Sequence, residues 1–114
     1  MDNCLFCRII KGEIPSDKVY EDEYVYAFKD IHPVTPVHVL VVPKVHIDSL
    51  EALNDDNIEN VIHVHHGIKK VAEITGINKD GYRVIVNCGK GAGQTVFHLH
   101  YHVIGGTKLN EKII

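Results

Sequence analysis

Apolar residues along the chain fall into short runs that are separated by polar turns. Residues 18–21 and 24–28 are rich in aromatic and β-branched side chains, and the acidic pair Asp22 and Glu23 lies between them, which predicts two strands joined by a turn. Residues 38–42 are apolar with little interruption, which predicts a third strand that is buried on both faces and ends at Pro43.

Two further strands are predicted in the second half of the chain. Residues 82–87 follow a turn that contains Gly81, and residues 96–104 run up to Gly105 and Gly106. The segment 30–36 is predicted to be a loop, because its two prolines exclude both a helix and a central strand.

Helical spacing is clearest between residue 56 and about residue 75. Asn54 or Asp55 is predicted to cap this helix, and Gly76 to end it. The apolar positions at helical spacing are Ile58, Val61, Ile62, Ile68, Val71, Ala72 and Ile74. Residues 4–12 predict a short N-terminal helix, and a further turn of helix is expected within residues 48–53. Strands grouped around one long helix predict an α+β fold with a mostly antiparallel, five-stranded sheet.

The composition indicates a single globular domain over residues 1–114. Hydrophobic residues make up 45% of the chain and charged residues 24%, which is typical of globular proteins and unlike disordered ones. The formal net charge of -3 provides no basic surface for nucleic acid. No apolar run approaches the ~20 residues that span a bilayer, and no secretory leader is visible at the N-terminus. We therefore expect a cytoplasmic protein that binds neither nucleic acid nor a membrane.

Three of the nine histidines, His98, His100 and His102, alternate with apolar residues near the end of the chain. In a strand they share one face, and burying three imidazoles without partners is costly, so the pattern favours a functional role. Residues two apart on one face are separated by roughly 6.6 Å, so the outer pair lies about 13 Å apart. Because zinc–nitrogen bonds are only about 2 Å long, the three histidines are not expected to share one metal ion. At least one of them has another task.

Cys4 and Cys7 form a C-x-x-C pair, which is half of a tetrahedral zinc site. The same spacing occurs in thioredoxin-like redox pairs, but no predicted strand leads into this one. A site completed by two histidines is favoured over two unligated thiols. Cys88 stands alone and is expected to be a small buried residue.

A glycine-rich turn at residues 88–94 directly precedes the histidines. Its backbone N–H groups, together with the side chains of Gln94 and Thr95, could bind a phosphate. The predicted helix carries His63, His65 and His66, which we expect at or near the surface, with His65 nearest the apolar stripe.

Five segments of the chain resemble the histidine triad (HIT) superfamily, and in particular bacterial proteins of the Hint type. These segments are residues 4–10, 14–16, 28–31, 38–47 and 94–104. The resemblance implies a purine nucleotide-binding hydrolase or transferase that acts at the α-phosphate of nucleoside phosphoramidates. It also implies a homodimer and one structural zinc ion per chain, bound by Cys4, Cys7, His46 and His98.

The resemblance further assigns roles within the site. His100 would be the nucleophile and form a nucleotidyl-histidine intermediate, and the backbone carbonyl of His98 would fix its tautomer. His102 and His38 would face the phosphate or the leaving group. The expected nucleotide contacts are Asp30 with the ribose, Ile31 with the base, and Asn87, Gly93, Gln94, Thr95, His100 and His102 with the phosphate and its surroundings.

The chain departs from the family pattern at two positions, and two other functions stay open. Thr95 stands where a serine is common, and His32 stands where many relatives have serine. One alternative function is a nucleotide-sensing module that works through a protein partner and hydrolyses only incidentally. The other is a zinc-handling protein, which would bind more than one zinc ion per chain.

Overall fold

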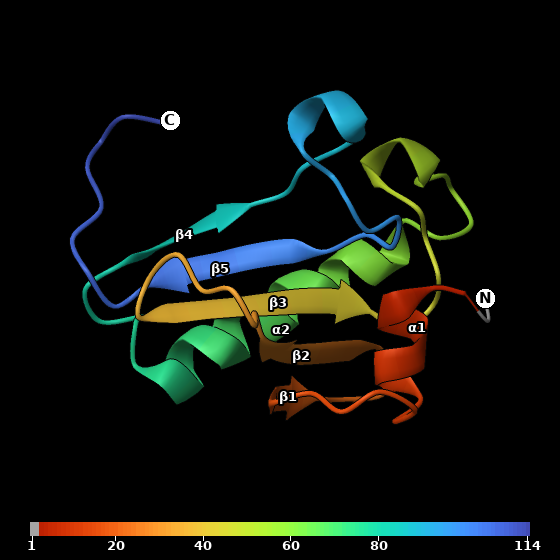
Figure 1. Ribbon diagram of the computed structural model, residues 1–114, viewed down its shortest axis with the longest axis horizontal. Helices are drawn as coiled ribbons and strands as arrows, with labels where there is room; N and C mark the ends of the chain where they lie inside the picture. Colours follow the sequence, from red (N-terminus) through yellow and green to blue (C-terminus); the bar gives the residue numbers. More distant parts are fainter. Residues whose placement is uncertain (1–2) are drawn as a thin grey trace.

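The computed structural model describes residues 3–114 and has a five-stranded antiparallel sheet with one long helix (Figure 1). The elements are α1 (Leu5–Ile10), β1 (Lys18–Glu21), β2 (Val25–Lys29), β3 (Val37–Pro43), α2 (Glu59–Thr75), β4 (Tyr82–Ile85) and β5 (Tyr101–Gly105), with short 3-10 turns at Leu50–Ala52 and Lys90–Ala92. The strand order is β1-β2-β3-β5-β4. The predicted α+β fold is confirmed. Among the helices within residues 3–114, none is both long and apolar enough to cross a membrane.

Strand β3 lies in the centre of the sheet and is buried on both faces, as its apolar sequence predicts. It pairs with β2 on one side and with β5 on the other, with His38 opposite Ile104 and Leu40 opposite His102. Residues 38–43 are all buried. Because side chains alternate along a strand, β3 contributes to a separate core on each face.

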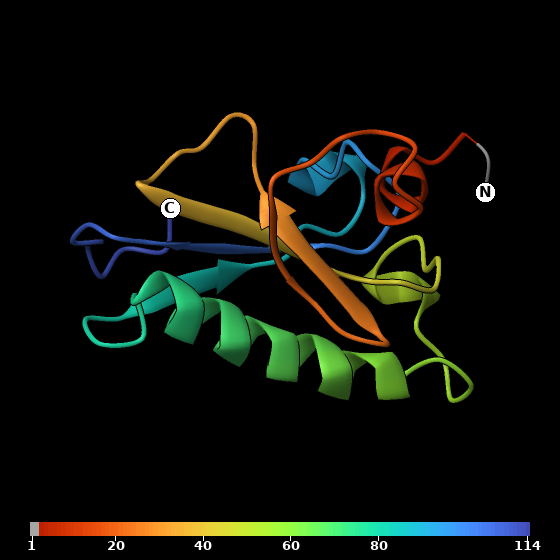
Figure 2. The same ribbon diagram turned by 90° about the horizontal axis from the view of Figure 1, so that it is seen from below.

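Helix α2 covers one face of the sheet, and α1 lies on the other (Figure 2). The core under α2 includes Val39 and Val41 of β3, and the core under α1 includes Leu40 and Val42. A Cβ atom on Gly67 would lie 3.0 Å from a methyl group of Val25, so glycine at this position lets α2 approach the sheet closely. His38 and His102 lie on the same face of the sheet as Leu40, which is the face that carries α1.

The long helix begins three residues later than predicted, at Glu59 rather than residue 56. The side chain of Asn54 accepts hydrogen bonds from the backbone N–H groups of Asp56 and Asn57, at 2.8 and 3.1 Å, and so stabilises a turn before the helix instead of capping it. Gly76 ends the helix in a left-handed conformation, as predicted. Three of the predicted stripe positions are exposed rather than buried: Ile58, Ile62 and Ile74.

The strand predicted over residues 96–104 is shorter and begins at Tyr101, and β4 ends at Ile85 rather than residue 87. The pairing of β5 with β3 stops at Val41 opposite Tyr101. Beyond that point Leu99 donates its backbone N–H to the carbonyl of Ile47, at 2.7 Å, so the segment 96–100 follows the chain after β3. His98 and His100 therefore precede the strand, although they keep the predicted alternation because Leu99 packs in the α2 core.

Candidate functional site

Four side chains that are far apart in the sequence meet beside the end of β3. The Sγ atom of Cys4 lies 3.5 Å from Nδ1 of His98, and the Sγ atom of Cys7 lies 3.5 Å from the same nitrogen and 3.4 Å from Nδ1 of His46. All four potential ligand atoms lie within 4.8 Å of one another. In a tetrahedral zinc site, bonds of about 2.3 Å to sulfur and 2.0–2.1 Å to nitrogen place sulfur and nitrogen about 3.5 Å apart. The spacing therefore fits such an ion.

The hydrogen bonds behind these histidines turn their lone pairs toward the cluster. Nε2 of His98 donates to the carbonyl of Pro43 at 2.8 Å, and Nε2 of His46 donates to Asp48 at 2.6 Å. Each Nδ1 is left without its proton and faces the sulfur atoms, which is the tautomer that a metal ligand requires. Burial raises the pKa of the Cys7 thiol, and a bound cation would oppose this by stabilising the thiolate.

His100 follows this cluster and has one ring nitrogen free. Its Nδ1 donates to the backbone carbonyl of His98 at 2.8 Å, so the unprotonated nitrogen is Nε2. Every fully buried side-chain nitrogen or oxygen in residues 3–114 has a hydrogen-bond partner. Nε2 of His100 has none, so it is not fully buried and a ligand can reach it. Burial lowers the pKa of His100, which keeps the ring neutral and its lone pair available at neutral pH.

Beside His100, a chain of hydrogen bonds sets the tautomers of His38 and His102. The backbone N–H of Val34 donates to Nδ1 of His38 at 3.1 Å, so the proton of His38 is on Nε2. That nitrogen lies 2.9 Å from Nδ1 of His102 and 3.4 Å from a carboxylate oxygen of Asp30. His102 therefore accepts at Nδ1 and carries its own proton on Nε2.

The environment of His102 keeps it uncharged. Burial lowers its pKa to about 4, and the neighbouring His100 and His38 add to this effect while Asp30 opposes it. The rings of His100 and His102 lie with their centroids 5.2 Å apart. The site thus combines one nitrogen lone pair, on His100, with one N–H donor, on His102.

The stability of the fold is expected to fall as the pH falls from about 6.5 to about 4. An unfolded histidine takes up a proton below its ordinary pKa of 6.5, whereas folded His102 stays neutral down to about 4, so acid favours the unfolded chain in this window. Urea unfolding at several pH values should show a smaller fall for His102→Gln than for the wild type. The difference should be about 1–2 kcal/mol, below the full shift because the ring is partly open to solvent. Equal falls in both proteins would contradict the shifted pKa.

The predicted nucleotide contacts differ in how open they are. Asp30 is partly buried and holds the backbone N–H of His32 at 2.8 Å, while Ile31 is 86% exposed. Gly93 and Thr95 are exposed, and Asn87 is half-buried. Gln94 is buried, and its side-chain amide bonds to the backbone of Gly89, Asp48 and Val96. Gln94 therefore supports the turn from inside, and the amide that was expected to bind phosphate is already occupied.

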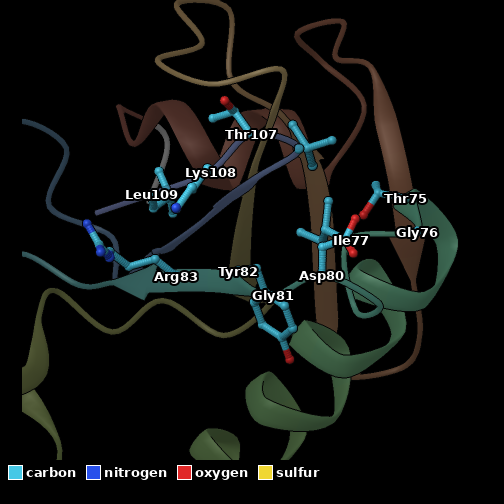
Figure 3. A pocket seen from close by; sticks show the side chains of 12 residues that line it. Thr75, Gly76, Ile77, Asp80, Gly81, Tyr82, Arg83, Thr107, Lys108 and Leu109 are labelled. Atoms are coloured by element: carbon cyan, nitrogen blue, oxygen red, sulfur yellow. The ribbon is translucent and has the colours of Figure 1, made fainter. Parts of the chain in front are cut away.

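Two cavities flank the sheet. One of about 520 Å³ is lined by Cys4, His46 and Thr95, and so lies beside the cysteine–histidine cluster. The other, of about 660 Å³, lies near the opposite end of β3, and Figure 3 shows Arg83 and Lys108 across it from Thr75. No motif in the sequence marked this second cavity. Arg83 donates to the backbone carbonyl of Asn110 and so fastens the C-terminal segment rather than contacting the histidines.

The remaining cysteine and histidine expectations need two corrections. Cys88 is half-buried rather than fully buried, because it lies in the irregular segment between β4 and the following turn. His63 is half-buried and stacks on Tyr24 with ring centroids 3.7 Å apart, whereas His65 and His66 are exposed. The ring of His65 still meets the buried Tyr101 of the α2 core, with centroids 6.1 Å apart, so only the expected order of exposure is corrected.

Comparisons with known proteins identify relatives of this chain. The family described as the HIT domain matches residues 11–109. Protein HitA from Neisseria gonorrhoeae is 44% identical over 92% of this chain and 97% of its own length. The purine nucleoside phosphoramidase of Escherichia coli (strain K12) is 39% identical over 98% of this chain and 94% of its own. Among solved structures, a HIT family hydrolase from Clostridium thermocellum is 54% identical with a TM-score of 0.97, covering 100% of this chain and 99% of that one. A histidine triad protein from Clostridium difficile is 53% identical with a TM-score of 0.92, covering 98% and 96%.

Proposed function

The chain belongs to the HIT domain family, and on that premise we propose that it is a hydrolase or transferase acting at the α-phosphate of purine nucleoside phosphoramidates or related conjugates. The reaction proceeds through a covalent nucleotidyl-histidine intermediate on His100. The observation that carries the proposal is the hydrogen bond from Nδ1 of His100 to the carbonyl of His98, at 2.8 Å, which leaves Nε2 as a nucleophile. The relation to a phosphoramidase at 39% identity supports the substrate class.

The proposed reaction has two displacements at phosphorus. Nε2 of His100 forms a bond to the α-phosphorus as the bond to the leaving amine breaks, and the amine takes a proton from solvent. Water then attacks the same phosphorus and gives up a proton to solvent, the phosphorus–nitrogen bond to His100 breaks, and a nucleoside monophosphate is released. His102 directs its Nε2–H toward the phosphoryl oxygens, where it stabilises developing negative charge, and His38 holds His102 through the 2.9 Å hydrogen bond.

The nucleotide is bound by the loops around the histidines. Asp30 accepts hydrogen bonds from the ribose hydroxyl groups, and the exposed Ile31 side chain covers the base. Thr95, Asn87 and the backbone at Gly93 hold the phosphate. Gln94 acts here by shaping the turn, because its amide is bonded within the protein.

The metal in this proposal is one structural zinc ion per chain, bound by the four residues of the cluster. Two thiolates and two imidazoles are one of the donor sets that structural zinc sites use, and the spacing and tautomers described above suit it. When bound, the ion cross-links the N-terminal segment to the core. A measured content above one zinc ion per chain would favour the zinc-handling alternative.

The experiment that tests the reaction is intact-protein mass spectrometry. The purified chain is mixed with an adenosine phosphoramidate and quenched early at mildly alkaline pH, at which a phosphoryl-histidine bond survives. A transient gain of one nucleotidyl group, mapped to His100 by peptide analysis, is the expected result. Product without any adduct would indicate direct attack by water or an intermediate too short-lived to trap. Tight nucleotide binding with neither adduct nor product would favour the sensing module.

We further propose that two copies associate through β4 and α2. Strand β4 is at the edge of the sheet, and Val84 is 40% exposed although it pairs with Val103, whose side chain lies in the α2 core. Ile62 of α2 is 71% exposed. Apolar side chains on a free edge and a neighbouring helix would be covered by a second copy.

The double substitution Ile62→Glu with Val84→Lys is expected to convert the dimer to a monomer. Light scattering after size-exclusion chromatography should then give a mass near 12.8 kDa, against twice that value for the wild type. Val34→Lys, which places a charge on an apolar residue that is 72% exposed in a different loop, is the control and should stay dimeric. A monomeric wild type would rule out this assembly.

A further inference from the structure

His98 contacts both the metal cluster and the proposed nucleophile. Its fully buried ring places Nδ1 at 3.5 Å from both cysteine sulfur atoms, and its Nε2 is held by Pro43. The backbone carbonyl of the same residue accepts the 2.8 Å hydrogen bond from Nδ1 of His100. One residue therefore links the cluster, through its ring, to the hydrogen bond that sets the tautomer of His100, through its backbone carbonyl.

Phe6 makes a second connection between the cluster and His100. It lies between Cys4 and Cys7 in α1, and its buried ring meets the His100 ring edge-on, with centroids 5.1 Å apart and an interplanar angle of 89°. The same ring also meets the ring of His98, with centroids 6.1 Å apart. Packing against one side of an imidazole restricts rotation about its Cβ–Cγ bond.

Helix α1 is only six residues long, so it depends on its surroundings for its position. Cys7 in this helix and Cys4 at its N-cap both belong to the Cys4/Cys7/His46/His98 cluster, and the Sγ atom of Cys4 accepts the backbone N–H of Cys7 at 3.4 Å. An ion bound to these two sulfur atoms would fix both sides of the turn that carries Phe6.

From these contacts we propose that metal binding at Cys4, Cys7, His46 and His98 positions the His100 ring for reaction, through the carbonyl of His98 and the ring of Phe6. Phe6 is thereby a positioning residue, and the cluster serves reactivity as well as stability. The inference rests on the proposed function for the role of His100, but the orientation and tautomer of that ring are measurable without any turnover.

The first test compares the zinc-loaded and chelator-treated full chain, both reduced and at one pH, by NMR of nitrogen-15-labelled histidine. Signals of His100 are identified with the His100→Ala variant. We expect a single Nδ1–H tautomer with zinc and a mixture of both tautomers without it, while the backbone amide signals of β1, β2 and β3 stay in place. A single Nδ1–H tautomer in the folded, metal-free chain would overturn the proposal.

Phe6→Leu supplies a test that does not require metal removal, because all four ligands are kept. We expect one zinc ion per chain, an unchanged His98 tautomer and mixed tautomers at His100. The control is Ile9→Val, in the same helix and the same buried core but without a described contact to either histidine ring. This control should keep the single His100 tautomer, and a single tautomer in Phe6→Leu as well would exclude Phe6 as a positioning residue.

Single-turnover kinetics separate positioning from binding. Phe6→Leu should slow nucleotidylation by about 10-fold, the order expected for a misplaced reacting group, with less than about a twofold change in nucleotide Kd. Weaker binding with an unchanged nucleotidylation rate would assign Phe6 to substrate binding and contradict the proposal. If the wild type forms neither adduct nor product, the proposed reaction fails, whereas the NMR comparison still decides whether the metal orients His100.

Discussion

Replacement of His100 by alanine is expected to lower phosphoramidate turnover by about 10⁴-fold or more and to leave nucleotide affinity within a few-fold of the wild type. The substitution removes Nε2 of His100, the unprotonated ring nitrogen that is proposed to attack phosphorus. The groups expected to hold ribose and phosphate, including Asp30 and Thr95, are untouched. Steady-state kinetics and calorimetric titration with a nucleoside monophosphate measure the two quantities on the same preparation.

The matched control for this variant is His65→Ala, which removes an exposed histidine from α2 and should change neither quantity. His102→Ala should slow turnover less than His100→Ala, because it removes a hydrogen-bond donor and not the nucleophile. Turnover of His100→Ala within about 10-fold of the wild type would show that another group attacks phosphorus.

Cys7→Ser is expected to lose the zinc ion and to unfold at least about 3 kcal/mol more easily than the wild type, because the binding energy of a structural metal is coupled to folding. The buried Cys7 sulfur lies within 3.5 Å of both histidine nitrogens of the cluster, so its loss removes the central ligand. For a domain of this size, the melting temperature should fall by more than about 10 °C. Metal analysis and calorimetric melting of both proteins provide the measurement.

Cys88→Ser is the control for the thiol itself, since Cys88 is half-buried and is not one of the cluster residues. It should keep one zinc ion and melt close to the wild type. An unchanged melting temperature for Cys7→Ser together with a loss of turnover would mean that the ion acts in the chemistry and does not stabilise the fold.

Local patterns in the sequence were sufficient to predict the order of the elements. The apolar run of β3, the acidic turn between β1 and β2, and Gly76 at the end of α2 all depend on residues that are neighbours in the chain. The start of β5 could not be predicted in this way. It depends on where β3 ceases to offer a partner and on the Leu99 hydrogen bond to Ile47, and both belong to a distant segment.

The same distinction applies to the candidate site. Strand geometry alone indicates that the three alternating histidines do not share one metal ion, but it does not say which of them turns to the cysteines. Only the folded chain brings His98 beside Cys4 and Cys7. It also bonds Nδ1 of His100 to the carbonyl of His98, which leaves Nε2 of His100 unpaired. Gln94 is a second example, because its inward orientation depends on the carbonyl of Asp48, 46 positions earlier.

The four residues of the candidate zinc site come from almost the full length of the chain. Cys4 and His98 are 94 positions apart, so an ion that joins them closes a loop containing most of the protein. In an unfolded chain, a tie of that span removes conformational entropy worth about 4–5 kcal/mol, much as a long-range disulfide does. During synthesis on the ribosome, the fourth ligand emerges only after the central strand and the long helix have been made. The completed site therefore forms late, and a bound ion would show that the N-terminal cysteines have docked against His98.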